Sequence, residues 1–186
     1  ALAIQGLVVY MAILKGFTGL SPVRFLKKFL PVMGFAFSTA TSNATIPMSI
    51  DTLNKKMGVS KQISSFTIPL GATINMDGTS IMQGVAVIFI AEAYGIHLTP
   101  ANLATVVVTA TLASIGTAGI PSVGLVTLAM VLNSVGLPTE GIALIMGIDR
   151  ILDMLRTAVN ITGDAVCTTI VSHQEKALNR EVFNRD

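Results

Sequence analysis

The feature that most constrains the fold of this chain is a long stretch without formal charge. No Asp, Glu, Lys or Arg occurs between Glu92 and Glu140, and roughly 20 consecutive apolar residues are enough for one helix to cross a bilayer. Of the 186 residues, 52% are hydrophobic and 12% are charged, whereas soluble domains carry about 25% charged residues. The sequence therefore predicts a membrane protein.

The basic residues gather in two clusters near the start of the chain and in its tail. They are Lys15, Arg24, Lys27, Lys28, Lys55, Lys56, Lys61, Lys176, Arg180 and Arg185. Because cytoplasmic loops are enriched in Lys and Arg, we expect these residues on the cytoplasmic side of a multi-pass protein. A nucleic-acid partner is not expected, since no basic face lies on a polar domain. The single cysteine, Cys167, excludes an internal disulfide.

Polar residues interrupt the apolar stretches in places where a simple membrane helix would not tolerate them. The stretch from residue 29 to 50 contains a polar cluster followed by Pro47, which predicts a re-entrant hairpin whose second arm starts at Pro47. Asn75–Thr79 predicts an unwound turn inside the apolar helix 62–94. Residues 114–121 interrupt the uncharged stretch 101–132 in the same way.

These breaks predict an all-α membrane protein with two re-entrant helical hairpins and two long, broken transmembrane helices. The expected segments are 1–28, the end of a further transmembrane helix, inside which the chain begins, and a cytoplasmic connector; 29–61, the first hairpin and a cytoplasmic loop; 62–100, the unwound helix; 101–138, the second hairpin; 139–174, the last transmembrane helix; and 175–186, a cytoplasmic tail. Residues 40–47 resemble residues 113–121, and the two units run in opposite senses. Such inverted repeats of broken segments point to a transporter site near the bilayer midplane.

The last apolar helix carries the strongest functional signal. Asp153, Arg156, Thr157, Asn160 and Asp164 follow helical spacing and fall on one face. One charge at the bilayer centre costs at least about 2.5–3.5 kcal/mol, so this stripe needs partners. Arg156 fits a carboxylate, Asp153 fits an ammonium group, and Asn160 and Asp164 offer oxygen ligands to an alkali cation. The alternative, a structural Asp153–Arg156 ion pair, would not require Asn160 and Asp164.

Two further groups of residues have both a functional and a structural interpretation. In the 75–79 segment, backbone carbonyls with Asn75 and Asp77 can dehydrate a cation, or Asp77 can cap a kinked helix. At the hairpin tips, Ser42 and free N–H groups suit an anion, and Gly119 and Gly124 permit close backbone approach, or these residues give simple loop flexibility. No Walker loop, HExxH motif or serine elbow is present, so an enzyme is not expected.

Three long motifs resemble one transporter family. Ser64–Thr79, Ala113–Pro121 and Gly147–Asp164 are similar, in this order, to the signature segments of the glutamate transporter family, the dicarboxylate/amino acid:cation symporters. The resemblance implies an elevator mechanism, in which a transport domain slides against a trimeric scaffold and the two hairpins act as gates. The partners so implied are a small acidic substrate, the lipid bilayer and two further copies of the full-length protein.

The resemblance also assigns site residues by position. Substrate contacts fall on Ser42, Thr79, Ile120, Gly124, Asp153, Arg156, Thr157 and Asn160. One Na⁺ site uses the carbonyls of Gly71, Asn75 and Asn160 with the Asp164 carboxylate; a second uses the carbonyls of Thr73, Ser114, Ile115 and Thr117; a third uses Asn75 and Asp77. Arg156 would bind the substrate's side-chain carboxylate and Asp153 its amino group.

The sequence departs from the family pattern at two places. Ala40 and Met154 stand where members often carry a second arginine near the substrate, for which Arg150 could substitute. Gln83 stands where animal transporters have a glutamate linked to proton and potassium coupling. Gln83 therefore disfavours potassium countertransport and favours the prokaryotic mode, in the inner membrane. Asp164 favours Na⁺ over a proton as the coupling ion.

The predicted function is sodium-coupled symport of aspartate or glutamate across the plasma membrane. A C4-dicarboxylate is the alternative cargo, although it has no ammonium group for Asp153 to bind. A proton is the alternative coupling ion. An ion channel built on the same polar stripe is disfavoured, because a channel needs no second gate.

Overall fold

The computed structural model describes residues 1–115 and 119–185, and every regular element within them is a helix. Residues 1–74 form α1 (Leu2–Ile4), the π-helical η1 (Gln5–Val9), α2 (Tyr10–Thr18), α3 (Pro22–Thr39), α4 (Ser42–Met57) and α5 (Lys61–Ile74). The later part of the sequence forms α6 (Asp77–Ala93), α7 (Pro100–Ser114), α8 (Val123–Ser134), the 3₁₀ turn η2 (Thr139–Ile142), α9 (Ala143–Gln174) and α10 (Arg180–Asn184).

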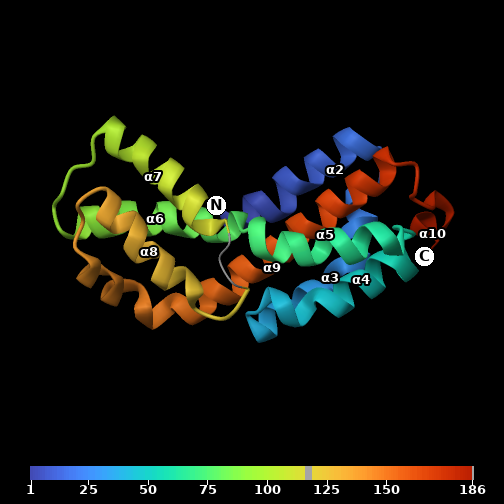
Figure 1. The fold of residues 1–186 in the computed structure, drawn as a ribbon, viewed down its shortest axis with the longest axis horizontal. Coiled ribbons are helices and arrows are strands. Elements are labelled where there is room, and N and C mark those ends of the chain that lie inside the picture. Colours follow the sequence, from blue (N-terminus) through green and yellow to red (C-terminus); the bar gives the residue numbers. More distant parts are fainter. Residues whose placement is uncertain (116–118, 186) are drawn as a thin grey trace.

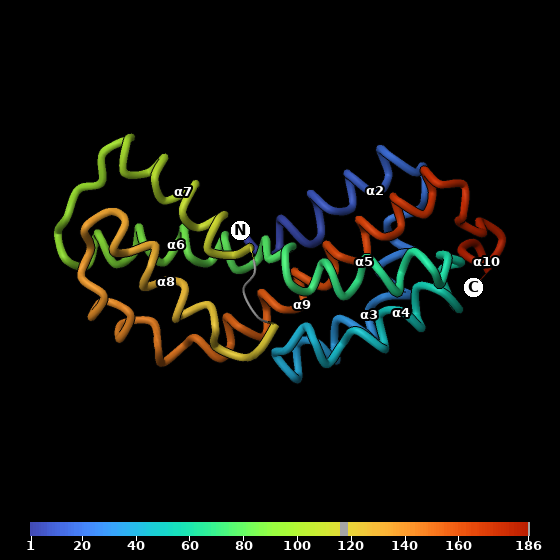
Figure 2. The backbone as a smooth tube through the Cα atoms, viewed as in Figure 1, coloured from blue at the N-terminus to red at the C-terminus, as the bar shows by residue number. Residues whose placement is uncertain are grey.

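The helices form two halves that share α9 (Figures 1 and 2). In one half, α2, α3, α4 and α5 pack on the C-terminal part of α9, and α10 packs on α4, around buried residues such as Leu14, Phe29 and Leu53. In the other half, α6, α7 and α8 pack with the N-terminal part of α9 around Val87 and Leu128. The consequence is that the junction of the halves lies at the middle of α9.

The first helix pair, α3 with α4, begins earlier than the sequence predicts. Ser21 caps α3 through a hydrogen bond from the Arg24 N–H, and Pro22 occupies its first turn, where a missing N–H costs nothing. The basic residues 24–28 therefore lie in a helix, and the expected boundary at Phe29 is wrong. The second arm also starts early, at Ser42.

The turn between these two helices explains why Pro47 does not start the second arm. Ala40 adopts a left-handed conformation, with φ 52°, and reverses the chain before Ser42. Pro47 then lies inside α4. A proline within a helix removes only its own backbone donor and distorts the preceding turn, so the helix continues through it.

The break between α5 and α6 is narrower than the predicted segment 75–79. Only Asn75 and Met76 are non-helical, and α6 begins at Asp77. The N–H groups of Thr79 and Ser80 both bond to the Met76 carbonyl oxygen, so the new helix forms its first turn at once.

The segment predicted as a polar tail is partly folded onto the protein. Phe183 of α10 is fully buried with Phe25 and Phe29. The Asn179 N–H donates to the Gly58 carbonyl oxygen at 2.8 Å, which fixes the approach to α10. An aromatic side chain in a polar segment therefore explains why this segment is not a free tail.

Within the described residues, one helical stretch, Lys61–Ala93, is long and apolar enough to cross a membrane. Residues 2–18, 100–114 and 123–134 form shorter apolar helices. Although α9 has 32 residues, it is not among these stretches. The transmembrane assignment of α9 stays a prediction.

Replacement of Gly58 by alanine should loosen the docking of α10. Gly58 has φ +70°, and a Cβ there would overlap the Asn179 carbonyl oxygen. Gly136 is the matched control, because it has the same φ and no atom within 4 Å of a built Cβ. Both variants should lose about 1–2 kcal/mol from left-handed strain, and Gly58→Ala should lose more. Thermal unfolding in detergent measures this, and equal losses would contradict the close contact.

Candidate binding site

Six polar residues of α9 form a buried face at the junction of the two halves. Asp149, Asp153, Arg156, Thr157, Asn160 and Asp164 are each no more than 5% exposed. The break between α5 and α6 and the tips of both helix pairs lie against this face. Polar groups that are so deeply buried must form hydrogen bonds or ion pairs with one another or with a ligand. These partners define what the site can bind.

Arg156 stands between two carboxylates. Its Nε donates to Asp153 Oδ1 at 3.0 Å, and its Nη2 lies 2.8 Å from the same oxygen. Its Nη1 lies 3.4 Å from Asp149 Oδ1. Nη2 nevertheless has no hydrogen bond of good geometry to any residue that the structure describes. The guanidinium therefore retains a donor for another acceptor, and the three groups together carry one negative charge.

The tip of the second helix pair, α7 with α8, packs directly on this ion pair. The Ser122 N–H donates to Asp153 Oδ2 at 2.7 Å. A Cβ at Gly124 would lie 2.7 Å from the Arg156 Cζ, so a larger residue there would require the guanidinium to shift. Gly124 was predicted as a substrate contact, whereas Ser122 was not. Ser122 contacts Asp153 through its backbone N–H, which almost every residue type has, so the residue type gives no signal.

The two tips also meet each other over the polar face. The Gly119 carbonyl oxygen accepts hydrogen bonds from the Thr41 hydroxyl and from the Asn43 N–H. The cavity beneath has a volume of ≈ 10 Å³, which is room for about one water molecule. Its lining is Ala40, Ser42, Met76, Thr79, Gly119, Ile120, Val123, Asp153, Arg156, Thr157 and Asn160. Seven of the eight predicted substrate contacts thus line one small cavity, and Gly124 packs behind it.

Asn160 attaches the start of α6 to α9. Its Oδ1 accepts the Gly78 N–H at 2.7 Å, and its Nδ2 lies 3.4 Å from Thr79 Oγ1. A Cβ at Gly78 would lie 2.7 Å from the Arg156 carbonyl oxygen. The break therefore presents Thr79 to the cavity at a position fixed by α9.

Asp164 lies beside the helix break, next to Asn75 and Gly71. Asp164 Oδ1 accepts the Asn75 side-chain amide at 2.7 Å, and a Cβ at Gly71 would overlap the same oxygen. All three residues line a cavity of ≈ 350 Å³ beside α5. A carboxylate beside a broken helix is an arrangement that cation sites of transporters use.

Asp77 has partners that sequence spacing did not reveal. Its Oδ2 accepts the Tyr10 hydroxyl at 2.9 Å and the Gln5 side-chain amide at 3.3 Å. Its side chain makes no capping hydrogen bond at the start of α6 in the part of the chain that the structure describes. Residues of α2 and η1 therefore hold the carboxylate, although no motif links them to residue 77.

The remaining predicted residues are less closely grouped. Thr73 is exposed, and its hydroxyl donates to the Leu70 carbonyl oxygen. Ser114 is buried and bonded to Ser80, and Ile115 is 52% exposed. Thr117 lies outside the described residues, so the second cation site stays a prediction.

Arg150, the possible substitute for the second arginine, and Gln83 lie apart from the cavity. Arg150 is exposed on α9, so it does not replace the missing second arginine at the cavity. Gln83 is fully buried, and its amide donates to Thr127 Oγ1 at 2.6 Å. A neutral amide at this position stabilises the contact between α6 and α8.

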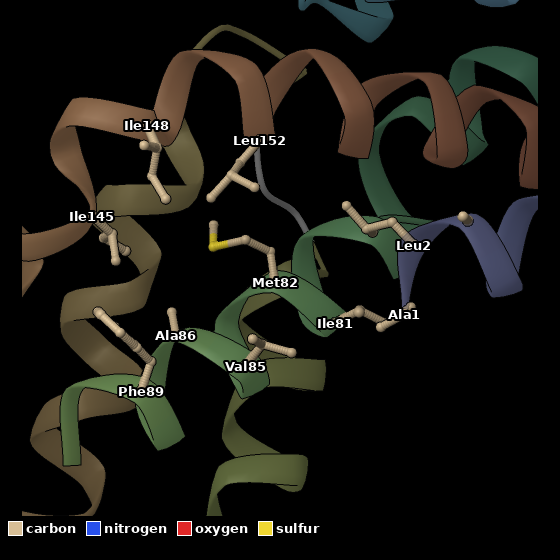
Figure 3. Close-up of a pocket in the computed structure, with 11 residues that line it drawn as sticks. Ala1, Leu2, Ile81, Met82, Val85, Ala86, Phe89, Ile145, Ile148 and Leu152 are labelled. Carbon is tan, nitrogen blue, oxygen red and sulfur yellow. The ribbon is translucent and has the colours of Figure 1, made fainter. Parts of the chain in front are cut away.

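A larger cavity of the molecule has the wrong chemistry for a charged ligand. A groove of ≈ 470 Å³ between the start of the chain, α6 and α9 is lined only by apolar side chains, including Met82, Phe89 and Leu152 (Figure 3). An ion would lose its hydration there without any polar partner. The polar cavity at Arg156 is therefore the candidate binding site.

Comparison with known proteins gives one consistent result. The model of the sodium:dicarboxylate symporter family matches residues 1–174. An excitatory amino acid transporter of Caenorhabditis elegans is 44% identical over 95% of this chain and 35% of its own length. Excitatory amino acid transporter 2 of Homo sapiens is 44% identical over 84% of this chain and 27% of its own length. Neutral amino acid transporter A of Bos taurus is 42% identical over 95% of this chain and 34% of its own length.

The family match covers all the elements that build the candidate site. The matched region contains the broken helix, both helix pairs and the whole of α9. The chain spans about a third of the length of the relatives that it matches. With a family model that matches almost all of its residues, the chain belongs to the sodium:dicarboxylate symporter family.

Proposed function

We propose that the full-length protein is a symporter that moves an acidic amino acid together with sodium ions, and that the cavity at Arg156 binds the amino acid. The observation that carries this proposal is the buried Arg156–Asp153 pair beneath the two tips. A planar guanidinium recognises a carboxylate, and a carboxylate recognises an ammonium group. Aspartate and glutamate present both groups on one small molecule.

Binding would proceed by exchange of ion partners. Separating a buried ion pair leaves two charges without compensation, which costs about 3–5 kcal/mol when one partner is lost. A substrate ammonium at Asp153 and a substrate carboxylate at Arg156 would replace each lost partner by an equivalent one. Since the cavity of ≈ 10 Å³ is too small for an amino acid, the tip that carries Ser122 would have to withdraw first.

The Asp164 cavity would bind sodium. Sodium needs several oxygen ligands, and Asp164, Asn75 and the Gly71 backbone lie together around one cavity. A cation there would also offset the charge of Asp164, which is 4% exposed. A proton could neutralise the same carboxylate, but a proton does not need backbone carbonyls as further ligands.

The arrangement of the protein in the membrane is part of this proposal. The helix pairs would enter the bilayer as re-entrant hairpins from opposite sides, related as an inverted repeat. The full-length protein would form a homotrimer and work as an elevator in a plasma membrane. The relatives named above are animal proteins, so a prokaryotic inner membrane rests on Gln83 and stays a prediction.

The cargo class follows from the charges in the cavity. A C4-dicarboxylate would meet Arg156 favourably, but its second carboxylate would face Asp153. A neutral amino acid would match Asp153 and leave the Arg156 guanidinium without a substrate partner. An acidic amino acid fits both residues, and it is therefore the cargo that we propose.

Uptake by the full-length protein in proteoliposomes tests the proposal directly. Labelled aspartate or glutamate should accumulate when an inward sodium gradient is imposed, and succinate should not. A pH gradient without sodium should give no accumulation. Uptake of succinate alone, or uptake of aspartate driven by pH alone, would contradict the cargo or the coupling ion respectively.

Replacement of Arg156 by alanine should remove acidic substrates selectively. Loss of one partner of a buried charge pair costs about 2–5 kcal/mol in binding, so aspartate affinity should fall by at least about 30-fold. Arg150→Ala is the matched control, because Arg150 lies on the same helix but is exposed. An aspartate affinity unchanged in Arg156→Ala would remove Arg156 from the site.

Replacement of Asp164 by asparagine should weaken sodium coupling. The substitution keeps the shape of the side chain and removes the charge that faces the cavity beside Gly71. The sodium concentration for half-maximal uptake should rise at least about tenfold, equivalent to roughly 1.4 kcal/mol. Cys167→Ala, next to the same cavity, should leave it unchanged. Equal sodium dependence in both variants would exclude Asp164 as a ligand.

A further inference from the structure

A second concentration of charge lies at the end of the first helix pair that is remote from its tip. There, a cavity of ≈ 560 Å³ opens between α3, the end of α4 and α10. Within residues 1–115 and 119–185, every charged side chain in its lining is a cation: Arg24, Lys27, Lys28, Lys55, Lys56 and Arg185. Like charges held in one cavity repel one another, and the resulting positive potential attracts an anion.

Two of these cations hold the walls of the cavity together. The Lys28 ammonium donates to the carbonyl oxygens of Lys56 at 2.8 Å and of Phe183 at 2.9 Å, so it joins α3 to α4 and α10. Arg24 Nη1 donates to Asn184 Oδ1 at 2.8 Å. These contacts order the two basic side chains at the wall of the cavity.

One carboxylate offsets part of this charge. Lys55 forms an ion pair with Asp51 at 2.6 Å. Four further cations of the lining form no ion pair with any carboxylate that the structure describes, which is an excess of four positive charges: Arg24, Lys27, Lys56 and Arg185. A single phosphodiester would neutralise one of them. A headgroup with two or more phosphates matches the excess far better.

The cavity also has an apolar edge. Lys27 shares one face of α3 with Val23 and Leu30, at helical spacings of four and three residues. Val23 is 76% exposed and Leu30 is 62% exposed. A lipid could place its headgroup among the cations and an acyl chain along these two side chains, whereas a soluble anion would make no use of them.

We propose that this cavity is a binding site for an anionic phospholipid whose headgroup carries at least two phosphates. Clusters of about four to eight Lys and Arg beside membrane helices bind such headgroups, and positive-inside charge distribution puts this end of α3 and α4 on the cytoplasmic side. The bound headgroup bridges α3, α4 and α10. It therefore stabilises the docked α10, and this role is separate from cargo transport.

Binding to the full-length protein in detergent tests the site. The probe is dioctanoyl phosphatidylinositol bisphosphate, compared with dioctanoyl phosphatidylserine and with soluble inositol trisphosphate. Each basic residue near an anionic headgroup contributes about 1 kcal/mol, or roughly fivefold. The double variant Lys27→Gln/Lys56→Gln should therefore bind the bisphosphate lipid about 30-fold more weakly, and the single variant Lys27→Gln about fivefold more weakly.

Lys15→Gln/Lys61→Gln is the matched control, because both lysines are exposed and lie outside the cavity. The control should retain affinity, and the bisphosphate lipid should raise the melting temperature of the wild-type protein but not of Lys27→Gln/Lys56→Gln. Equal losses in both double variants would overturn the assignment to the cavity. Equal affinity for soluble inositol trisphosphate would overturn the lipid as the source, and absence of binding would overturn the site.

Discussion

The buried Arg156–Asp153 pair is the interaction on which the rest of the site depends. A guanidinium that is 2% exposed needs acceptors on several sides, and α9 alone supplies only Asp149 and Asp153. The second helix pair adds the Ser122 N–H as a donor to Asp153, and its Gly124 backbone packs against the guanidinium. Buried charges must be paired or bonded, so the contacts of the ion pair determine how the tip of the second helix pair sits on α9.

Much of this architecture could be predicted because the relevant signals are contiguous in the sequence. Periodicity alone predicted one polar face on the last helix, and the structure buries every member of it. The family could be identified from three uninterrupted motifs. The helix boundaries were harder to predict, because Pro22 and Pro47 were interpreted as loop and helix-start signals. In the structure Pro22 starts α3, and α4 tolerates Pro47 in its interior.

The contacts that the sequence did not predict are between residues far apart in the chain. Tyr10 donates to Asp77 across 67 positions, and Ser122 reaches Asp153 through its backbone. Neither contact has a spacing or a residue type that would reveal it. The folding of α10 was missed for a similar reason, because the partners of Phe183 lie on α3 and α4.

The packing of the two tips distinguishes the part of the site that can move from the part that cannot. At the first tip, Ala36, Ala40, Ser42 and Thr45 are all buried, so displacing it would expose core surface along α9. At the second tip, Ile115 and Ile120 are each 52% exposed, and the bonds that its described residues make to Asp153 and to the first tip are polar. Water or a substrate can replace polar bonds at little net cost, whereas exposed apolar surface has no such compensation. We therefore expect opening at the second tip to be the less costly way into the cavity, and the same opening would free Asp153 to receive a ligand.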